Sequence, residues 1–415
     1  MTSPTLLVAD QIAGTVAALS LPDGTETARI EGRHLAEHAG FLALPGSRTA
    51  FVDDRAGELV VLDPHGPAEG RPFVTATAPV ATPAEHLATD PSGQLVAVST
   101  GLGWNATPWS DLLTVVDLTG DRRGPRSVRV RTRTGEPGVT VTAPTDDTGG
   151  LVVLRHREPG SLTAYRVGDL LNARFACPAA EPVHELPLPD DGHGDAYDHE
   201  SGWLYSATGA GVHRTRAEGD RLTVGEPLPW DGPGRGYYLR RDPVRGLLWS
   251  CVRGGPADPG RWPEWTNDAW WHRIGSDTVG RVPLGPGLVF RLAVAARHVA
   301  YARIHPDGDE LVLLDAGSDG PRVVHRLPLP AMDGAPRAGG TPWDGVQRRA
   351  VAASPGGGLI AVTRGGHGEI HLVDATAGNG TPSLTTITVP TPLDEGGHLA
   401  LVHPGDGAES DPIGR

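Results

Sequence analysis

Short apolar runs that end in an aspartate and a turn recur along the whole chain. The clearest copies are Leu59–Asp63, Leu113–Asp117, Leu311–Asp315 and Ile370–Asp374. A second apolar run precedes each copy, and a third run close to a proline follows the later copies. Short apolar runs bounded by Gly, Pro, Asp and Ser predict β-strands joined by tight turns. No segment shows a helical apolar period over a convincing length, so the pattern predicts an all-β chain.

A further apolar run opens most of the repeated units, which gives each unit an inner, a second, a third and an outer strand. The complete units cover about 34–78, 83–133, 138–188, 193–229, 236–284, 288–329 and 347–390, and an incomplete unit runs from Thr5 to about Glu31. Gly397–Val402 is a lone inner strand that would complete the first unit, pairing the two ends of the chain and removing exposed edges.

Units of this length predict a single β-propeller over residues 1–404, most simply with eight four-stranded blades. Seven blades are the alternative, if the irregular fourth unit is an insertion. Residues 405–415 are predicted to be a disordered tail.

The turns at Asp90–Leu95 and Ser354–Leu359, together with the repeated Val-Val-Asp endings, resemble those of the β-propeller superfamily. The resemblance is greatest to the YVTN-type and amine-dehydrogenase heavy-chain-like propellers, and it covers nearly the whole chain. The Gly-His…Trp-Asp signature of WD40 repeats and the Trp docking motif of quinoprotein alcohol dehydrogenases are absent. The resemblance implies a fold but no activity, because propellers serve as enzymes and as scaffolds.

The amino-acid composition excludes several kinds of catalytic group, cofactor and partner. All 36 basic residues are arginine, so lysine-based catalysis, a pyridoxal-phosphate Schiff base and a P-loop are excluded. The Gly-x-Gly strings lie in predicted strand turns, which argues against a dinucleotide site. A net charge of −14 argues against a nucleic-acid partner. The two cysteines are too few for a disulfide framework, and no signal peptide or bilayer-spanning run is present, so we expect a cytoplasmic protein.

Histidines at the entries of the predicted inner strands form the first candidate site. Ring closure would bring these entries to one central mouth, where imidazoles could bind Fe, Cu or Zn while arginine and tyrosine hold an anionic group. The predicted metal ligands are His38, His86, His193 and His398; the predicted catalytic residues are His86, His193, Tyr238 and Arg291; Tyr237 and Arg349 are predicted substrate contacts. Glu37, Glu85 and Asp195 stand beside three of the histidines and could orient them. The alternatives are a metal-free polar pocket at the same place, or histidines that only cap strand ends.

Tryptophan-rich links form the second candidate site. In a propeller, the links between second and third strands and those between blades share the face on which the inner strands begin. Side chains on such links would cover the mouth, as binding loops often do. The predicted substrate contacts on these links are Trp104, Trp109, Trp265, Trp270 and Trp343. The alternative is that they pack the insertions against the rim.

These features predict an enzyme of specialised metabolism that acts at the central mouth on a small, anionic and partly aromatic molecule. In one form of this hypothesis, the histidines bind a metal ion that takes part in the reaction. The alternative function is a non-catalytic scaffold for a protein or peptide, which would need an exposed apolar patch. A sugar-binding module would need equivalent pockets between blades, but the tryptophans are not spaced at the repeat. Nucleic acid and membrane are not expected partners.

Overall fold

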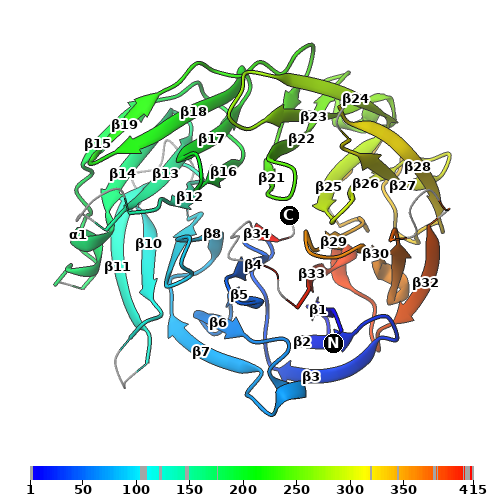
Figure 1. Ribbon diagram of the computed structural model, residues 1–415, viewed down its shortest axis with the longest axis horizontal. Helices are drawn as coiled ribbons and strands as arrows, with labels where there is room; N and C mark the ends of the chain where they lie inside the picture. The colour runs from blue at the N-terminus through cyan, green and yellow to red at the C-terminus, as the bar shows by residue number, and fades with distance from the viewer. Residues whose placement is uncertain are drawn as a thin grey trace.

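Eight antiparallel sheets surround a central axis in the computed structural model (Figure 1). The structure describes residues 3–102, 110–120, 124–144, 149–174, 176–317, 320–343, 345–376, 380, 382–404, 406 and 412–413. Each sheet is one blade, with its first strand next to the axis and its last strand at the rim. The predicted eight-bladed propeller is therefore confirmed.

In every blade except blade 1, the strands that run from the axis to the rim follow one another along the chain. Blade 1 joins β33 (His398–Val402) to β1 (Thr5–Asp10), β2 (Thr15–Ser20) and β3 (Thr25–Glu31). Blade 2 contains β4 (Phe41–Leu44), β5 (Arg48–Asp53), β6 (Glu58–Leu62) and β7 (Val74–Pro79). Blade 3 contains β8 (Ala84–Thr89), β9 (Leu95–Thr100), β10 (Ser110–Asp117) and β11 (Arg126–Arg133). Blade 4 contains β12 (Gly138–Val141), β13 (Leu151–Arg157), β14 (Gly160–Arg166) and β15 (His184–Pro187).

The second half of the ring repeats the arrangement. Blade 5 contains β16 (Asp195–Asp198), β17 (Trp203–Thr208), β18 (Gly211–Glu218) and β19 (Arg221–Val224). Blade 6 contains β20 (Arg235–Gly236), β21 (Arg240–Asp242), β22 (Leu247–Gly254), β23 (Thr266–Arg273) and β24 (Val279–Pro286). Blade 7 contains β25 (Leu288–Val294), β26 (His298–Ile304), β27 (Asp309–Asp315) and β28 (Arg322–Leu329). Blade 8 contains β29 (Val351–Ala353), β30 (Leu359–Arg364), β31 (Glu369–Asp374) and β32 (Ser383–Thr388).

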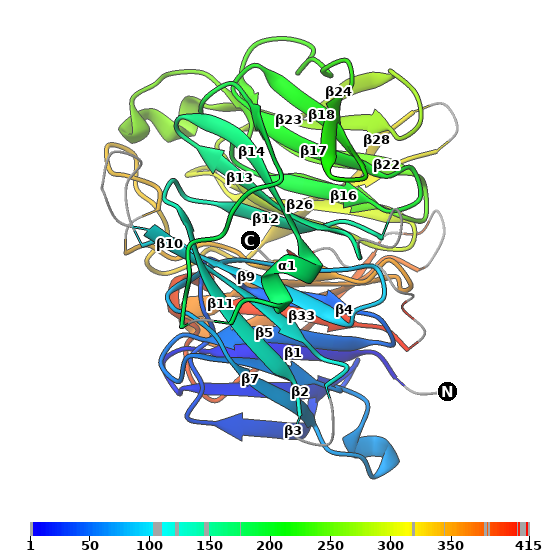
Figure 2. The same ribbon diagram turned by 90° about the vertical axis from the view of Figure 1, so that its left-hand side faces the viewer.

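The irregular fourth unit is a complete four-stranded blade, so the seven-bladed alternative is wrong. One short α-helix, α1 (Val167–Leu171), lies on the outside of the ring beside β11 (Figure 2). The described 3-10 turns are η1 (Pro67–Glu69), η2 (Pro259–Glu264), η3 (Gly365–His367) and η4 (Asp394–Gly396). None of the helices among the described residues is long and apolar enough to cross a membrane.

The two ends of the chain close the ring, as the sequence predicts. β33 pairs antiparallel with β1, with Ala400 opposite Leu7 and Leu399 opposite Val8. Both strands are buried along their whole length. Pro412–Ile413 form β34, which pairs with β4 on the side facing the centre of the ring (Figure 1). Residues 405, 407–411 and 414–415 lie outside the described residues, so the disordered tail stays a prediction.

The core lies between the faces of neighbouring blades. Leu42 and Val52 of blade 2, for example, pack in one cluster with Leu87 and Val96 of blade 3. A blade that has neighbours on both faces needs apolar residues on both, which explains why the inner runs are continuously apolar rather than alternating. The rim strands have one wetter face, and β3 alternates between exposed and half-buried positions over much of its length.

The aspartates that end several of the apolar runs fix the turns that follow them. The Asp90 carboxylate accepts hydrogen bonds from the backbone N–H groups of Ser92, Gln94 and Leu95. Asp117 and Asp374 make the same kind of contact with the residue two positions on. An aspartate that satisfies turn N–H groups in this way sets where the next strand begins, so the repeat seen in the sequence is a repeat of turns.

Candidate functional site

A cavity of about 550 Å³ lies at the centre of the ring, on the face where the inner strands begin. All eight blades, or the links that lead into them, contribute residues to its wall. A volume of this size lies within the range of small-molecule pockets. The cavity therefore occupies the place that the inner-strand entries predict.

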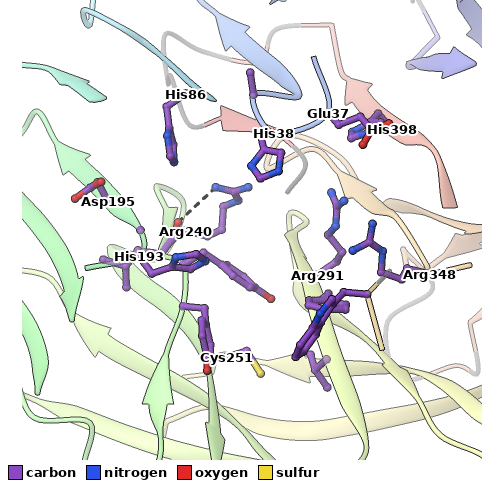
Figure 3. Close-up of a pocket in the computed structure, with 18 of the residues that line it drawn as sticks. Glu37, His38, His86, His193, Asp195, Arg240, Cys251, Arg291, Arg348 and His398 are labelled. Carbon is purple, nitrogen blue, oxygen red and sulfur yellow. Dashed lines mark hydrogen bonds between the residues drawn. The ribbon is translucent and has the colours of Figure 1, made fainter. Parts of the chain in front are cut away.

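Eight of the predicted metal ligands, catalytic residues and substrate contacts line this cavity: His38, His86, His193, Tyr237, Tyr238, Arg291, Trp343 and His398. They come together because each stands at or just before the start of an inner strand, or on a link over the mouth. Figure 3 shows the imidazoles of His86, His193 and His398 around the wall and the side chains of Arg240 and Arg291 reaching into the space between them.

Three predicted substrate contacts do not line the cavity: Arg349, Trp270 and Trp265. Arg349 does not line the cavity: it is 1% exposed, and its guanidinium donates to the Asp309 carboxylate at 2.8 Å and to the Thr363 carbonyl at 3.0 Å. Its neighbour Arg348 lines the cavity instead, because adjacent residues of an extended chain point to opposite sides. Trp270 lies in the core of blade 6, edge-on to Trp230, and donates to the Pro229 carbonyl at 3.1 Å.

Trp265 stands directly behind the cavity wall. Its ring stacks on Trp343, with centroids 6.0 Å apart and planes 18° apart. It therefore supports the wall rather than lining it. Trp104 and Trp109 lie outside the described residues.

Arg253 lines the cavity between two aromatic rings. Its guanidinium carbon is 4.2 Å from the ring centroid of Trp265 and 4.2 Å from that of Tyr237. It also donates to the Tyr237 hydroxyl. No ion pair among the described residues includes Arg253, so its contacts are aromatic and hydroxyl groups rather than carboxylates. A planar guanidinium fixed in this way is ready to bind a planar anion.

Tyr237 links this arginine to an imidazole. The Tyr237 and His193 rings meet edge to face, with centroids 5.5 Å apart and planes at 89°. The Tyr237 hydroxyl also accepts from Nε of Arg235 at 2.9 Å. His193 is therefore held against the ring that supports Arg253, so a ligand bound to Arg253 would lie close to an imidazole.

The carboxylates beside the histidines have different partners from one another. Glu85 Oε1 lies 3.1 Å from Nδ1 of His38, so this carboxylate does orient an imidazole. Asp195 instead accepts from Nε of the buried Arg155 at 2.8 Å and from the Ser206 hydroxyl at 2.8 Å. Asp195 is thus part of the scaffold of blades 4 and 5.

Acidic residues gather at one edge of the cavity, where the links lead into β4 and β33. Glu37, Asp394 and Glu395 line this edge, and Glu395 forms an ion pair with Arg348. Partial burial, and then the charges of Glu395 and Asp394, raise the pKa of Glu37. Gly396 has a φ of 99°, and a side chain there would clash with the backbone of Arg348. Glycine at this position therefore lets the link pass beside Arg348 and places His398 in the wall.

Cys251 and Tyr238 line the floor at blade 6. Burial raises the pKa of the Cys251 thiol to about 12 and the pKa of the Tyr238 phenol well above its usual value. Both groups are therefore neutral at physiological pH, which excludes a cysteine thiolate nucleophile here. Cys251 and Arg253 belong to no motif in the sequence. They stand two positions apart on β22, so their side chains lie on the same face of the strand.

The histidines do not form a metal centre in this arrangement. Within the described ranges, no group of three or more His, Cys, Asp or Glu side chains is placed to hold a metal ion. Figure 3 shows His38, His86, His193 and His398 spread around the wall rather than directed at one point. Metal ligands must converge to within about 2 Å of one ion, so the donor set does not fit the predicted four-histidine site.

Comparison with known proteins shows a shared fold. No family model matches the chain, and no curated protein matches it. AztD from Citrobacter koseri is 14% identical, covers 97% of this chain and 98% of its own, and has a TM-score of 0.65. The dihydro-heme d1 dehydrogenase NirN in complex with DHE is 14% identical, covers 98% and 76%, and has a TM-score of 0.59. A putative 6-phosphogluconolactonase from Bacteroides uniformis is 10% identical, covers 97% and 100%, and has a TM-score of 0.50.

Proposed function

We propose that this protein is an enzyme that binds a small organic anion with an aromatic part in the central cavity and uses imidazole groups for proton transfer. The observation that carries the proposal is Arg253, held between Trp265 and Tyr237 in the cavity wall, with His193 against Tyr237. Cation, aromatic surface and imidazole are thus side by side in one cavity.

Binding follows from the fixed guanidinium. Arginine holds a carboxylate through two parallel hydrogen bonds, and the order imposed by the two rings lowers the entropy cost of forming them. Trp343 and Tyr237 offer aromatic surface on the same wall. Arg240 and Arg291 reach in from blades 6 and 7 (Figure 3) and add positive potential at the centre.

Catalysis would rest on His193 and His86, which line the cavity from blades 5 and 3. Imidazole takes up and releases a proton near neutral pH, which makes it the commonest general acid or base. The chain has no lysine, and Cys251 is held as a neutral thiol. A resident metal is not part of the proposal, because the donor groups among the described residues do not converge.

Binding can be tested by isothermal titration calorimetry with 3-phenylpropionate, a simple aromatic carboxylate. Arg253→Met should weaken binding by about tenfold or more, as expected for loss of a charge-assisted hydrogen bond. Arg216→Met is the matched control, because Arg216 also lies over a tryptophan, 4.3 Å from the ring centroid of Trp203, but away from the cavity. Equal affinities in wild type and both variants would reject the anion site.

Catalysis can be tested with a mixture of small organic anions, followed by mass spectrometry for compounds that the wild type consumes. His193→Gln and His86→Gln should slow any such conversion by about a hundredfold, the usual contribution of a general acid or base. Elemental analysis of the same wild-type sample tests the metal version. Conversion that persists at the wild-type rate in both variants would remove histidine catalysis.

The scaffold alternative lacks a supporting surface among the described residues. The large apolar side chains that are exposed there are Ile12, Leu102, Val224, Val244 and Leu384. They belong to five different blades, so they form no continuous patch. Single exposed apolar residues are ordinary on a folded protein.

A further inference from the structure

The charged groups of the cavity are distributed unevenly around its wall. Glu37 and Asp394 come from the links that enter blades 2 and 1, whereas Arg253 and Cys251 come from blade 6. Blade 6 stands across the eight-bladed ring from blade 2 (Figure 1). Figure 3 likewise shows Glu37 beside His398 and far from Cys251. The cavity thus has an acidic edge and, across it, a basic wall.

The acidic edge keeps negative charge that the protein does not neutralise by pairing. Of its three carboxylates, Glu395 has Arg348 as an ion-pair partner. Within the part of the chain that the structure describes, no side-chain hydrogen bond or ion pair includes Glu37 or Asp394. Partial burial first, and then the charges of Glu395 and Asp394, raise the pKa of Glu37, while the charges of Arg348 and His38 oppose the shift. A cation placed between these carboxylates would relieve the repulsion.

The basic wall likewise has a positive charge that no carboxylate of the described residues neutralises. Arg253 has two aromatic neighbours and a hydroxyl, with no carboxylate among its ion-pair partners in the described ranges. The aromatic surface of Trp343 and Tyr237 belongs to the same cavity. A ligand that satisfies the whole cavity therefore needs an anionic group, an aromatic or other planar part, and a cationic group.

We infer that the ligand is a zwitterion whose carboxylate and ammonium group stand at opposite ends of an aromatic or other planar part. Its carboxylate lies at Arg253 and its ammonium group at Glu37 and Asp394. This inference rests on the proposed function and adds the amine to it. An ammonium group suits this edge because it donates three hydrogen bonds and can contact two carboxylates at once.

Three probes that differ only in their charged groups test the inference: 3-phenylpropionate, 2-phenylethylamine and 3-(4-(2-aminoethyl)phenyl)propionate, a zwitterion with its two charges at opposite ends of the ring. In calorimetric titrations of the full chain, the zwitterionic probe should bind about tenfold more tightly than either single-charge probe, as expected for one additional charge-assisted contact. The double variant Glu37→Gln, Asp394→Asn should abolish this advantage and leave the affinity for 3-phenylpropionate equal or higher. Arg253→Met should weaken the binding of the zwitterionic probe and of 3-phenylpropionate but not that of 2-phenylethylamine.

Glu31→Gln is the control for charge removal, because Glu31 is an exposed glutamate at the end of β3, away from the cavity. It should leave all three affinities unchanged. Equal binding of the zwitterionic probe and 3-phenylpropionate, with no effect of the double variant, overturns the zwitterion while leaving the anion site intact. If neither of the two probes that carry a carboxylate binds, and Arg253→Met changes no measured affinity, the proposed function is overturned and this inference with it.

Discussion

Arg348 and Arg349 are neighbours in the sequence but have opposite surroundings. Arg349 is buried with Asp309, which is 7% exposed and depends on it for charge compensation. Arg349→Met would leave a buried carboxylate without a partner, so we expect the free energy of unfolding to fall by about 3–5 kcal/mol. Arg348 and Glu395 are partly exposed, and Arg348→Met should cost less than about 1 kcal/mol. Urea denaturation measures the free energy of unfolding of each variant. Similar decreases for the two variants would contradict this account.

Two buried histidines make the stability depend on pH. Burial lowers the pKa of His156 to about 3 and that of His272 to about 4. Both values lie below the ordinary value near 6.5 that the unfolded chain would have. At a pH between these lowered pKa values and about 6.5, the folded state therefore binds fewer protons than the unfolded state. This stabilisation is complete above about pH 6.5 and is lost as the pH falls, by up to about 1.4 kcal/mol per pH unit for each group.

His156→Gln should reduce that slope. Glutamine can keep a hydrogen bond to the Arg133 carbonyl, which lies 3.1 Å from Nε2 of His156, but it does not titrate. Urea midpoints measured from pH 7 to pH 5 should fall less steeply for this variant than for the wild type. A slope identical to that of the wild type would show that His156 does not contribute.

At the scale of elements, the sequence predicts the ring because the same aspartate-stabilised turn recurs between strands. Asp90 and its counterparts bond to turn N–H groups, so aligning the turns aligns the strands and finds the inner-strand entries. The same alignment cannot distinguish adjacent residues, which is why the sequence predicts Arg349 as a substrate contact although Arg348 is the residue that lines the cavity.

Blade 6 departs from the repeat in a way that no alignment of turns could show. Its inner edge is divided into β20 and β21, and the intervening residues 237–239 pair with no strand partner. The gap leaves Cys251 and Arg253 of the second strand in the cavity wall, and brings Tyr237 beside them. The site therefore depends on an irregularity that is encoded by local packing rather than by the repeat.

The stack of Trp343, Trp265, Arg253 and Tyr237 gives a prediction at this scale. Trp265→Leu removes one of the two rings that hold the guanidinium, so 3-phenylpropionate should bind about threefold to tenfold more weakly, within the range of a cation–π contact. The near-ultraviolet circular dichroism should lose the contribution of the stacked indoles. Trp203→Leu, which removes a ring that contacts Arg214 and Arg216 outside the cavity, should not change binding. A Trp265→Leu variant with wild-type affinity would mean that Arg253 needs no second ring.

At the scale of the whole molecule, the closing strand determines whether the ring exists. β33 supplies the inner strand of blade 1, and its residues Leu399 and Leu401 pack in one cluster with Leu6 and Val8 of β1 and with blade 8. A chain that ends at Gly397 would expose the edge of β1 and an apolar face, which is a template for aggregation. We expect this shortened chain to be aggregated in gel filtration and to lose its cooperative thermal transition.

A chain that ends at Pro404 keeps β33 and should remain folded, with the same elution volume in gel filtration as the full chain and a thermal transition close to that of the full chain. A synthetic peptide with the sequence of residues 398–404, added in excess to the shortened chain during refolding, should restore soluble protein, because it can pair with β1 in the register that places Ala400 opposite Leu7. A peptide with Leu399 and Leu401 replaced by Asp should fail to do so, since it cannot bury its face against blades 1 and 8. Soluble, cooperatively melting protein from the shortened chain alone would show that seven complete blades and an open first blade suffice, and that closure serves only to bring His398 into the cavity wall.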